Sequence, residues 1–534
     1  MAEANTYLNS RAEANTYLNS RFKGERLDDY ETRGYFPVYL GDVLGDRYQV
    51  FRKLGTGSQC TVWLARDRNV STRLFRVLKI YDPKSSEKMR TLVDSLKHIS
   101  HPGEKHVEVP FDSFTIQGPK GTHLCTVVEP LGDPLSQFAE EAFDKRVELQ
   151  GGQQAGPGDL WSVDFAKRAC RQVLVALDYL HKRRIAHRDI AGRNVVFALQ
   201  YDLSAYDENY IMKSVWHKEE KPQEETPQEE GVSDRAEVSA STEPESENVS
   251  DSDSSSDSDD DDDNDKSPPQ WKLDFDECER RIAEYWAACE PGDATAEPLS
   301  DAWNKANFFN SRDSIELPQR RDGKPLGPDE VQYTVEGSPL ATGFDLGDVV
   351  NPDKCRTFRV VLTDLGFSCP FEECGKNPMP PAIDYMAPEG LLGLPDVPAS
   401  DIYSLGLWFW EVVMLRGFVV DAGYPQPKYR VLQCLARRLG PVPASLRAHW
   451  PDADQFLDAE GNSLETPEQD EDEYDDDFPR GDVWHQGRNR KPLDMSEEDL
   501  AGFVHLIQKM LRWEPENRPS TEELLQDPWF SNSL

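Results

Sequence analysis

The sequence has little of what secreted or zinc-binding proteins usually carry. Its nine cysteines are scattered over 534 residues, and even the two closest neighbours, Cys369 and Cys374, are separated by four residues. Scattered cysteines indicate reduced intracellular thiols rather than a disulfide framework, and their spacing does not predict a zinc site. The polar N-terminus has no apolar core of the kind found in a secretion signal. These absences favour an intracellular globular protein.

Long apolar runs are also scarce. Residues 402–420 form one such run, but Ser404, Glu411 and Arg416 interrupt it. Because charged side chains are costly inside a bilayer, the run predicts a buried helix of a globular domain rather than a membrane span.

Basic residues are few compared with acidic ones. The chain has 59 Lys and Arg against 98 Asp and Glu, a formal net charge of −39. Residues 218–265 carry −17 of this charge and residues 458–477 carry −11, which leaves −11 for the rest of the chain. Both segments are too polar to fold alone. Each is either a solvated, self-repelling linker or a docking surface, and an acidic groove would attract Arg-rich partners.

Two separated segments carry the main chemical signal. The stretch His187 to Asn194 reads His-Arg-Asp-Ile-Ala-Gly-Arg-Asn, and Asp364-Leu365-Gly366 follows after a long interval. Phosphoryl transfer needs a carboxylate to orient the attacking hydroxyl, a role that suits Asp189. It also needs oxygen ligands for magnesium, which Asn194 and Asp364 could supply. The sequence therefore predicts a phosphoryl-transfer site that an insertion divides.

A glycine-containing hairpin precedes these segments. Apolar runs 48–54 and 61–65 flank it and predict a strand, a turn and a strand over a nucleotide. Glycine lets backbone approach phosphate oxygens closely. The predicted nucleotide-binding residues of this hairpin are Leu54, Gly55, Thr56, Gly57, Ser58, Gln59, Cys60, Thr61 and Val62. Lys79, 17 residues after Val62, ends the strand-like run 74–78 and is expected to contact the nucleotide phosphates.

Further motifs follow the catalytic segments along the chain. Residues 386–389 read Met-Ala-Pro-Glu, residues 401–406 open an apolar helix, and Arg518 offers a partner for Glu389 in a structural clamp. Residues 161–182 show an apolar stripe at helical spacing. We expect Val77 and Val196 to sandwich an adenine ring. The backbone of the short link from Glu129 to Leu131 would bond to the edge of that ring.

In this order the motifs resemble those of eukaryotic protein kinases. Within these the chain is most similar to the SR-protein kinases, which phosphorylate Arg/Ser-rich splicing factors, and it resembles a divergent fungal-type member. The lead-in at 34–42 and the position of the insertion support the narrower resemblance, which covers residues 34–197 and 356–530. It implies an ATP- and Mg²⁺-dependent kinase with catalytic residues Asp189, Lys79 and Arg193.

The same resemblance implies an α+β, two-lobed kinase fold, with an antiparallel β N-lobe, a mainly helical C-lobe and a long, largely disordered insertion. We expect an extension at 1–34, an N-lobe at 35–131, a first C-lobe part at 132–197, an acidic spacer at 198–355 and a second C-lobe part at 356–534. The implied partners are basic protein substrates, with no nucleic acid, no membrane and a monomeric state. The implied location is cytoplasm and nucleus.

Two departures from the serine/threonine pattern affect the acceptor. Ala191 and Ala382 stand where a lysine and a threonine usually contact the catalytic aspartate. Arg193 resembles the arginine that supplies positive charge in tyrosine kinases, and it differs from lysine in reach and geometry. A dual-specificity or tyrosine kinase is therefore an alternative. Ser368 and Tyr385 do not occupy the usual site of a regulatory phosphothreonine, which favours activity without phosphorylation.

The acid that should pair with Lys79 is also in question. Alignment of the first large helix of the N-lobe puts Leu92 at the expected position, with Asp94 and Glu87 nearby. These two acids are seven residues apart on a similar helix face, so either is a candidate. If neither serves, the chain is a kinase-shaped scaffold that acts by binding.

Two further segments lie outside these motifs. Residues 2–11 are repeated as 12–21, a duplication without a functional account. Within the insertion, residues 271–289 have apolar side chains at helical spacing. This segment is predicted to pack on the kinase or, alternatively, to bind a partner as an amphipathic helix.

Overall fold

The computed structural model of the chain describes residues 27–70, 74–96, 101–139, 142, 162–205, 315–316, 331, 334–335, 337, 340, 352–376, 382–415, 417–419, 428–464, 491–492 and 494–531. The chain divides into two units, residues 1–215 with 296–534 and residues 216–295, and every described residue belongs to the first. None of the described helices is long and apolar enough to cross a membrane.

Several predicted segments lie outside the described residues. They are the N-terminal duplication at 2–21, the acidic segment 218–265, the predicted helix 271–289 and residues 465–477 of the second acidic segment. The predictions for these segments stay predictions.

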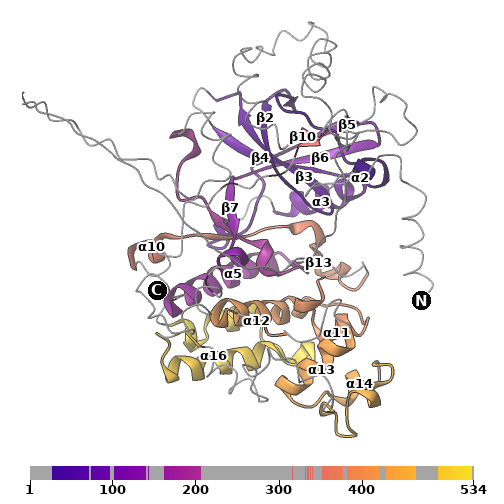
Figure 1. Cartoon of the computed structure of the whole chain (residues 1–534), viewed down its shortest axis with the longest axis vertical. Helices are drawn as coiled ribbons and strands as arrows, with labels where there is room; N and C mark the ends of the chain where they lie inside the picture. Colours follow the sequence, from indigo (N-terminus) through magenta and orange to yellow (C-terminus); the bar gives the residue numbers. More distant parts are fainter. Residues whose placement is uncertain are drawn as a thin grey trace, which may run out of the picture. The chain divides into compact units, whose positions relative to one another are not determined.

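A six-stranded antiparallel sheet forms the N-terminal lobe (Figure 1). Its strands, in the order in which they pair, are β1 (Val43–Leu44), β2 (Tyr48–Thr56), β3 (Cys60–Asp67), β4 (Phe75–Tyr81), β6 (Gly121–Val128) and β5 (Asp112–Gly118). The predicted hairpin is confirmed as β2 and β3. Strand β4 continues two residues beyond Lys79, so Lys79 lies within the strand opposite Val62, and the prediction that it ends the strand was wrong.

One long helix, α3 (Pro83–Leu96), packs against this sheet (Figure 1). Met89, Leu92, Val93 and Leu96 occupy positions i, i+3, i+4 and i+7 of this helix, and all four are buried. This spacing places them on one helix face, which packs against the core. Before the sheet, the short helix α2 (Leu27–Thr32) leads into the lobe.

Two small sheets connect the catalytic segments. Strand β9 (Val195–Ala198) pairs with β7 (Leu131–Pro134) on one side and with β12 (Val360–Leu362) on the other. Strand β8 (Ile185–Ala186) pairs with β13 (Cys369–Pro370). The residues on either side of the long insertion are therefore hydrogen-bonded neighbours in the folded chain.

The C-terminal lobe is built mainly from helices (Figure 1). Helix α5 (Val163–Lys182) begins at Ser162, whose side chain accepts a hydrogen bond from the backbone N–H of Phe165, and its predicted apolar stripe is buried. Helix α12 (Ala399–Met414) packs against α5 and α16 (Glu497–Met510). Trp408 and Trp410 of α12 are fully buried, which confirms the predicted core helix.

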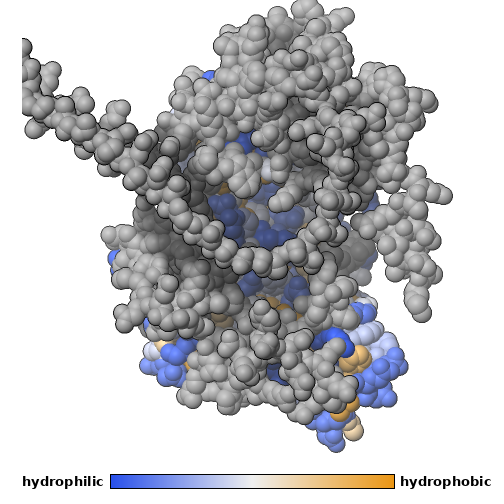
Figure 2. Space-filling view, in the orientation of Figure 1, coloured by the Kyte–Doolittle hydropathy of each residue, from blue (hydrophilic) through white to orange (hydrophobic). Residues whose placement is uncertain are grey.

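The remaining helices are shorter. They are α10 (Pro352–Thr357), α11 (Pro388–Leu391), α13 (Lys428–Leu439), α14 (Ala444–Arg447) and α17 (Thr521–Leu525). The 3₁₀ turns are η1 (Glu104–His106), η2 (Gly192–Asn194), η3 (Leu203–Ala205), η5 (Leu365–Phe367), η6 (Phe371–Glu373), η7 (Ile383–Tyr385), η8 (Ala453–Gln455), η9 (Pro515–Asn517) and η10 (Pro528–Phe530), and β10 (Ile315–Glu316) pairs with β11 (Thr334–Val335). Figure 2 shows a mostly hydrophilic described surface near α13 and α14, with a few apolar side chains.

The predicted clamp between Glu389 and Arg518 is confirmed. Two guanidinium nitrogens of Arg518 donate to the two carboxylate oxygens of Glu389, each at 2.8 Å, and both side chains are buried. Arg518 also donates to the backbone oxygens of Ala399 and Trp513. The pair therefore joins the start of α11 to the segments around α12 and η9.

Candidate active site

The predicted catalytic loop lies between β8 and β9, and its hydrogen bonds converge on Asp189. The side-chain amide of Asn194 donates to the backbone oxygen of Asp189 at 2.7 Å and to its Oδ2 at 3.0 Å. Arg193 donates to both carboxylate oxygens, at 2.8 and 2.9 Å. Asp189 is 6% exposed. The loop thus holds the carboxylate in one orientation with a cation beside it.

Asp401 at the start of α12 holds the backbone of this loop. Its Oδ2 accepts from the backbone N–H of His187 at 2.8 Å, and its Oδ1 accepts from that of Arg188 at 2.7 Å. Arg188 has a left-handed backbone with φ of 71°, a conformation that costs energy for a non-glycine residue. Burial raises the Asp401 pKa, but the hydrogen bonds from His181 and the Arg188 backbone outweigh it and hold this pKa below its usual value.

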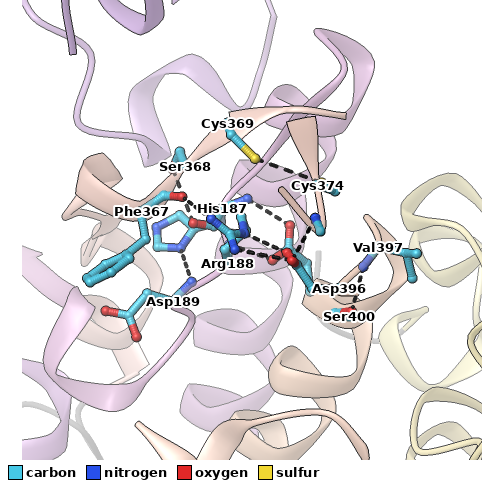
Figure 3. Close-up of polar contacts among 12 residues, drawn as sticks. His187, Arg188, Asp189, Phe367, Ser368, Cys369, Cys374, Asp396, Val397 and Ser400 are labelled. Atoms are coloured by element: carbon cyan, nitrogen blue, oxygen red, sulfur yellow. Dashed lines mark hydrogen bonds and ion pairs between the residues drawn. The ribbon is translucent and has the colours of Figure 1, made fainter. Parts of the chain in front are cut away.

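Arg188 forms a buried ion pair with Asp396 (Figure 3). Two of its guanidinium nitrogens donate to the two Asp396 oxygens at 2.5 and 3.1 Å, and a third contact reaches the backbone oxygen of Phe367 at 3.2 Å. Both charged side chains are 2% exposed. Ser368, a hydroxyl considered as a regulatory site, is buried and donates to the backbone oxygen of His187. The Asp396 carboxylate therefore neutralises Arg188 of the catalytic loop.

The predicted metal-binding turn follows β12. Asp364 has a left-handed backbone with φ of 59°, and its Oδ1 accepts from the N–H of Gly366 at 3.3 Å. The backbone N–H of Thr363 donates to the backbone oxygen of Asn194 at 2.8 Å. The two predicted metal ligands, Asn194 and Asp364, are thus brought together although the insertion separates them in sequence.

Lys79 pairs with an acid that sequence reasoning missed. Its Nζ lies 2.5 Å from Oε2 of Glu108, which follows η1. The predicted partners Glu87 and Asp94 were wrong, because both are exposed on α3, while Leu92 faces the core. Glu108 could have been found in the sequence as the charged residue within the otherwise apolar run 107–110, because a buried charged side chain needs a partner.

The glycine-containing loop is held from the lead-in before the sheet. The Tyr35 hydroxyl donates to the backbone oxygen of Gly57 at 2.7 Å, and Arg33 donates to that of Ser58 at 2.6 Å. A Cβ atom built at Gly55 would meet nothing within 4 Å, whereas one built at Gly337 would lie 2.7 Å from the Gly55 Cα, so Gly337 approaches this backbone closely. Neither Tyr35 nor Arg33 was among the predicted site residues.

The predicted adenine contacts come from several strands. Val77, Leu54 and Val62 belong to one apolar cluster, and Val196 lies in β9. Glu129 directs its carboxylate to Arg359, with N–O distances of 2.8 and 2.5 Å. Leu131 begins β7. The rest of the predicted hairpin residues lie at the ends of β2 and β3 and in the turn between them.

The chemistry of these side chains fits a nucleotide with Mg²⁺. Asp364 lies close enough to Lys79 to act on it electrostatically, and Asn194, whose backbone oxygen bonds to Thr363, could supply a further oxygen ligand. Gln59 reaches the same turn, because a Cβ built at Gly366 would lie 2.5 Å from its Oε1. This buried oxygen has no hydrogen-bond partner among the described residues. The anionic phosphates of a nucleotide and the Mg²⁺ ion would complement the Lys79 ammonium and this unpaired Gln59 oxygen.

Comparison with known proteins agrees with this geometry. The family described as protein kinase domain matches residues 353–530. A serine/threonine protein kinase of Aspergillus fumigatus is 26% identical over 523 residues, which cover 95% of this chain and 90% of that protein. This chain is a protein kinase.

Relatives of the kinase with higher identity match shorter parts of it. Protein kinase dsk1 of Schizosaccharomyces pombe is 35% identical over 189 residues, 33% of this chain and 31% of that protein. SRSF protein kinase 3 of Homo sapiens is 34% identical over 180 residues, 32% of this chain and 29% of that protein. The predicted two-lobed fold is confirmed, and the enzyme class is serine/threonine protein kinase.

The serine/threonine kinase class bears on the two alternative functions, a non-catalytic scaffold and a dual-specificity or tyrosine kinase. The non-catalytic scaffold was considered because no acid of α3 suited Lys79, and Glu108 removes that ground. The tyrosine-kinase alternative rested on Ala191, Arg193 and Ala382. In the structure Arg193 pairs directly with Asp189, so the predicted replacement for the usual lysine lies beside the predicted catalytic carboxylate.

Proposed function

We propose that this kinase transfers the γ-phosphoryl group of ATP to serine or threonine hydroxyls of basic, Arg/Ser-rich proteins. The observation that carries the proposal is the convergence of Lys79, Asp189, Asn194 and Asp364 from three separate segments. These are the cation, the carboxylate and the oxygen ligands that phosphoryl transfer uses.

Each residue has one role in this proposal. Asp189 orients the acceptor hydroxyl and takes up its proton, and the hydrogen bonds from Asn194 and Arg193 hold its carboxylate in position. Lys79 contacts the nucleotide phosphates, and Arg193 also offsets charge on the transferred group. Asn194 and Asp364 would hold Mg²⁺, which neutralises phosphate charge when bound.

Two features support a basic substrate. The first is similarity to a relative whose name states that it acts on SRSF proteins. The second is Glu411, which accepts a hydrogen bond from the Tyr385 hydroxyl. A Cβ built at Gly192, in the catalytic loop, would lie 3.5 Å from Oε1 of Glu411. A carboxylate beside the catalytic loop would favour an arginine near the acceptor serine.

Radiolabelled phosphate transfer to an Arg/Ser peptide tests the proposal, with Asp189→Ala as the inactive control. We expect incorporation by the wild type and almost none by the variant. Equal incorporation by both would refute the kinase mechanism. Phosphoamino-acid analysis of the product is expected to show phosphoserine.

A second peptide tests the substrate class separately. With Ala replacing each Arg, kcat/KM is expected to fall at least about tenfold, which corresponds to about 1.4 kcal/mol. Glu411→Gln should reduce the difference between the two peptides, because it removes the charge that favours arginine. If both peptides react equally well with the wild type, the kinase activity stands and the Arg/Ser preference does not.

A further inference from the structure

We propose that Glu108, rather than an acid of α3, is the positioning residue for Lys79, and that it couples Lys79 to the strand that ends at the metal-binding turn. This inference rests on the proposed kinase function. It concerns a residue that acts through Lys79 and touches no substrate.

The first argument is the contact itself. Glu108 Oε2 lies 2.5 Å from Lys79 Nζ, and the two side chains are 8% and 13% exposed. Burial alone would lower the Lys79 pKa, but Glu108 and the neighbouring groups outweigh it and hold this pKa above its usual value. The ammonium thus stays charged in a buried place because a carboxylate faces it.

The second argument is how the backbone of Glu108 is held. Residues 105–108 run beside β12, and each makes a contact with residues 359–362. Arg359 donates to the backbone oxygen of Lys105 at 2.7 Å, and Nδ1 of His106 lies 2.9 Å from the backbone oxygen of Val360.

Two further contacts complete this attachment. Val107 forms a parallel bridge with Leu362, and the backbone N–H of Glu108 donates to the Leu362 oxygen at 3.0 Å. Asp364 follows Leu362 by two residues. The acid that positions the lysine and the predicted metal ligand therefore share one hydrogen-bonded support. A shift of one would move the other.

The third argument is the different contact that α3 makes with the site. Lys88 of α3 donates from Nζ to the backbone oxygen of Gly366 at 2.9 Å. Glu87 and Asp94 are exposed on the same helix. Helix α3 thus supplies a cation to the metal-binding turn, while the acid that pairs with Lys79 is Glu108. We therefore expect movement of α3 to leave this ion pair in place.

The expected effect of removing the carboxylate follows from geometry. Without Glu108, the Lys79 ammonium loses the partner that fixes its direction, and Asp364 is a carboxylate that still acts on it electrostatically. Misplacement of a group by about 1 Å can lower a rate about 100-fold. We therefore expect Glu108→Gln to lower kcat about 100-fold at saturating ATP. Glu87→Gln and Asp94→Asn are matched exposed controls and should leave kcat unchanged.

A double-variant cycle distinguishes positioning from a structural role. Lys79→Met removes the group through which Glu108 is proposed to act, so Glu108→Gln should cause almost no further loss of kcat in that background. An equal loss in both backgrounds would overturn the inference, as would unchanged kcat in Glu108→Gln alone. Glu108→Asp keeps the charge and should retain more activity than the glutamine variant.

The α3 variants still test the proposal if Glu108→Gln does not fold. In that case, a tenfold loss of kcat in Glu87→Gln or Asp94→Asn refutes the proposal, and unchanged kcat in both variants supports it. Wild-type activity is measured first on the Arg/Ser peptide. If wild type and Asp189→Ala are equally inactive, the proposed function fails. If the wild type is active and the glutamine variant matches it, only the role of Glu108 fails.

Discussion

His106 is a buried titratable group in the segment that carries Glu108. It is 7% exposed, and burial lowers its pKa from 6.5 to about 4, against the opposing effect of its hydrogen bond to Val360. The folded protein therefore holds this ring neutral, while the unfolded chain protonates it near pH 6.5. Because the folded-state pKa is the lower one, the stability that the ring contributes is present above pH 6.5 and is lost as pH falls toward 4.

The size of this effect follows from the shift. A displacement from 6.5 to about 4 corresponds to about 3 kcal/mol in total. Linkage gives about 2 kcal/mol of this loss between about pH 7.5 and about pH 5. We expect His106→Asn to remove that part of the pH dependence. The asparagine amide occupies the place of Nδ1 and can still donate to the Val360 oxygen, but it does not titrate.

Urea denaturation of both proteins at the two pH values measures the difference. The wild type should lose about 2 kcal/mol more free energy of unfolding than the variant on acidification. His505→Asn, at an exposed histidine, is the matched control and should behave as the wild type. The reasoning would be refuted if His106→Asn and the wild type lost the same free energy of unfolding between the two pH values.

Three further outcomes are expected. Arg518→Ala should lower the free energy of unfolding by about 3 to 5 kcal/mol in urea, because it leaves Glu389 charged and buried; a loss below 1 kcal/mol would contradict a buried pair. Tyr35→Phe should raise the KM for ATP with little change in kcat, since it releases the Gly57 carbonyl, and an unchanged KM would show that this contact does not hold the loop. Phosphatase-treated kinase should keep full activity, because Asp396 already pairs with Arg188 of the catalytic loop. Inactivation by the phosphatase would disprove activity without phosphorylation.

Local signals predicted much of the fold because the information lies within short segments. Two apolar runs predicted the hairpin of β2 and β3, helical spacing predicted α5, and the apolar run 402–420 predicted α12. The catalytic loop was recognisable for the same reason, since Asp189, Arg193 and Asn194 lie within six residues and contact one another directly.

The partners of buried charges could not be predicted in this way. The acid for Lys79 was sought on α3, where helical spacing placed Glu87 and Asp94, but the burial of Leu92 turns those acids outward. Glu108 reaches Lys79 only because residues 105–108 bond to a strand that lies beyond the insertion.

The sequence by itself determined the family, the order of the motifs and the identity of the groups that carry the proposed chemistry. These depend on residue type and on spacing along the chain, both of which can be read directly. The tertiary structure alone decided that Lys79 pairs with Glu108 and Arg188 with Asp396. A buried ion pair is selected by which backbone segments pack together, and that depends on contacts between residues far apart in the sequence.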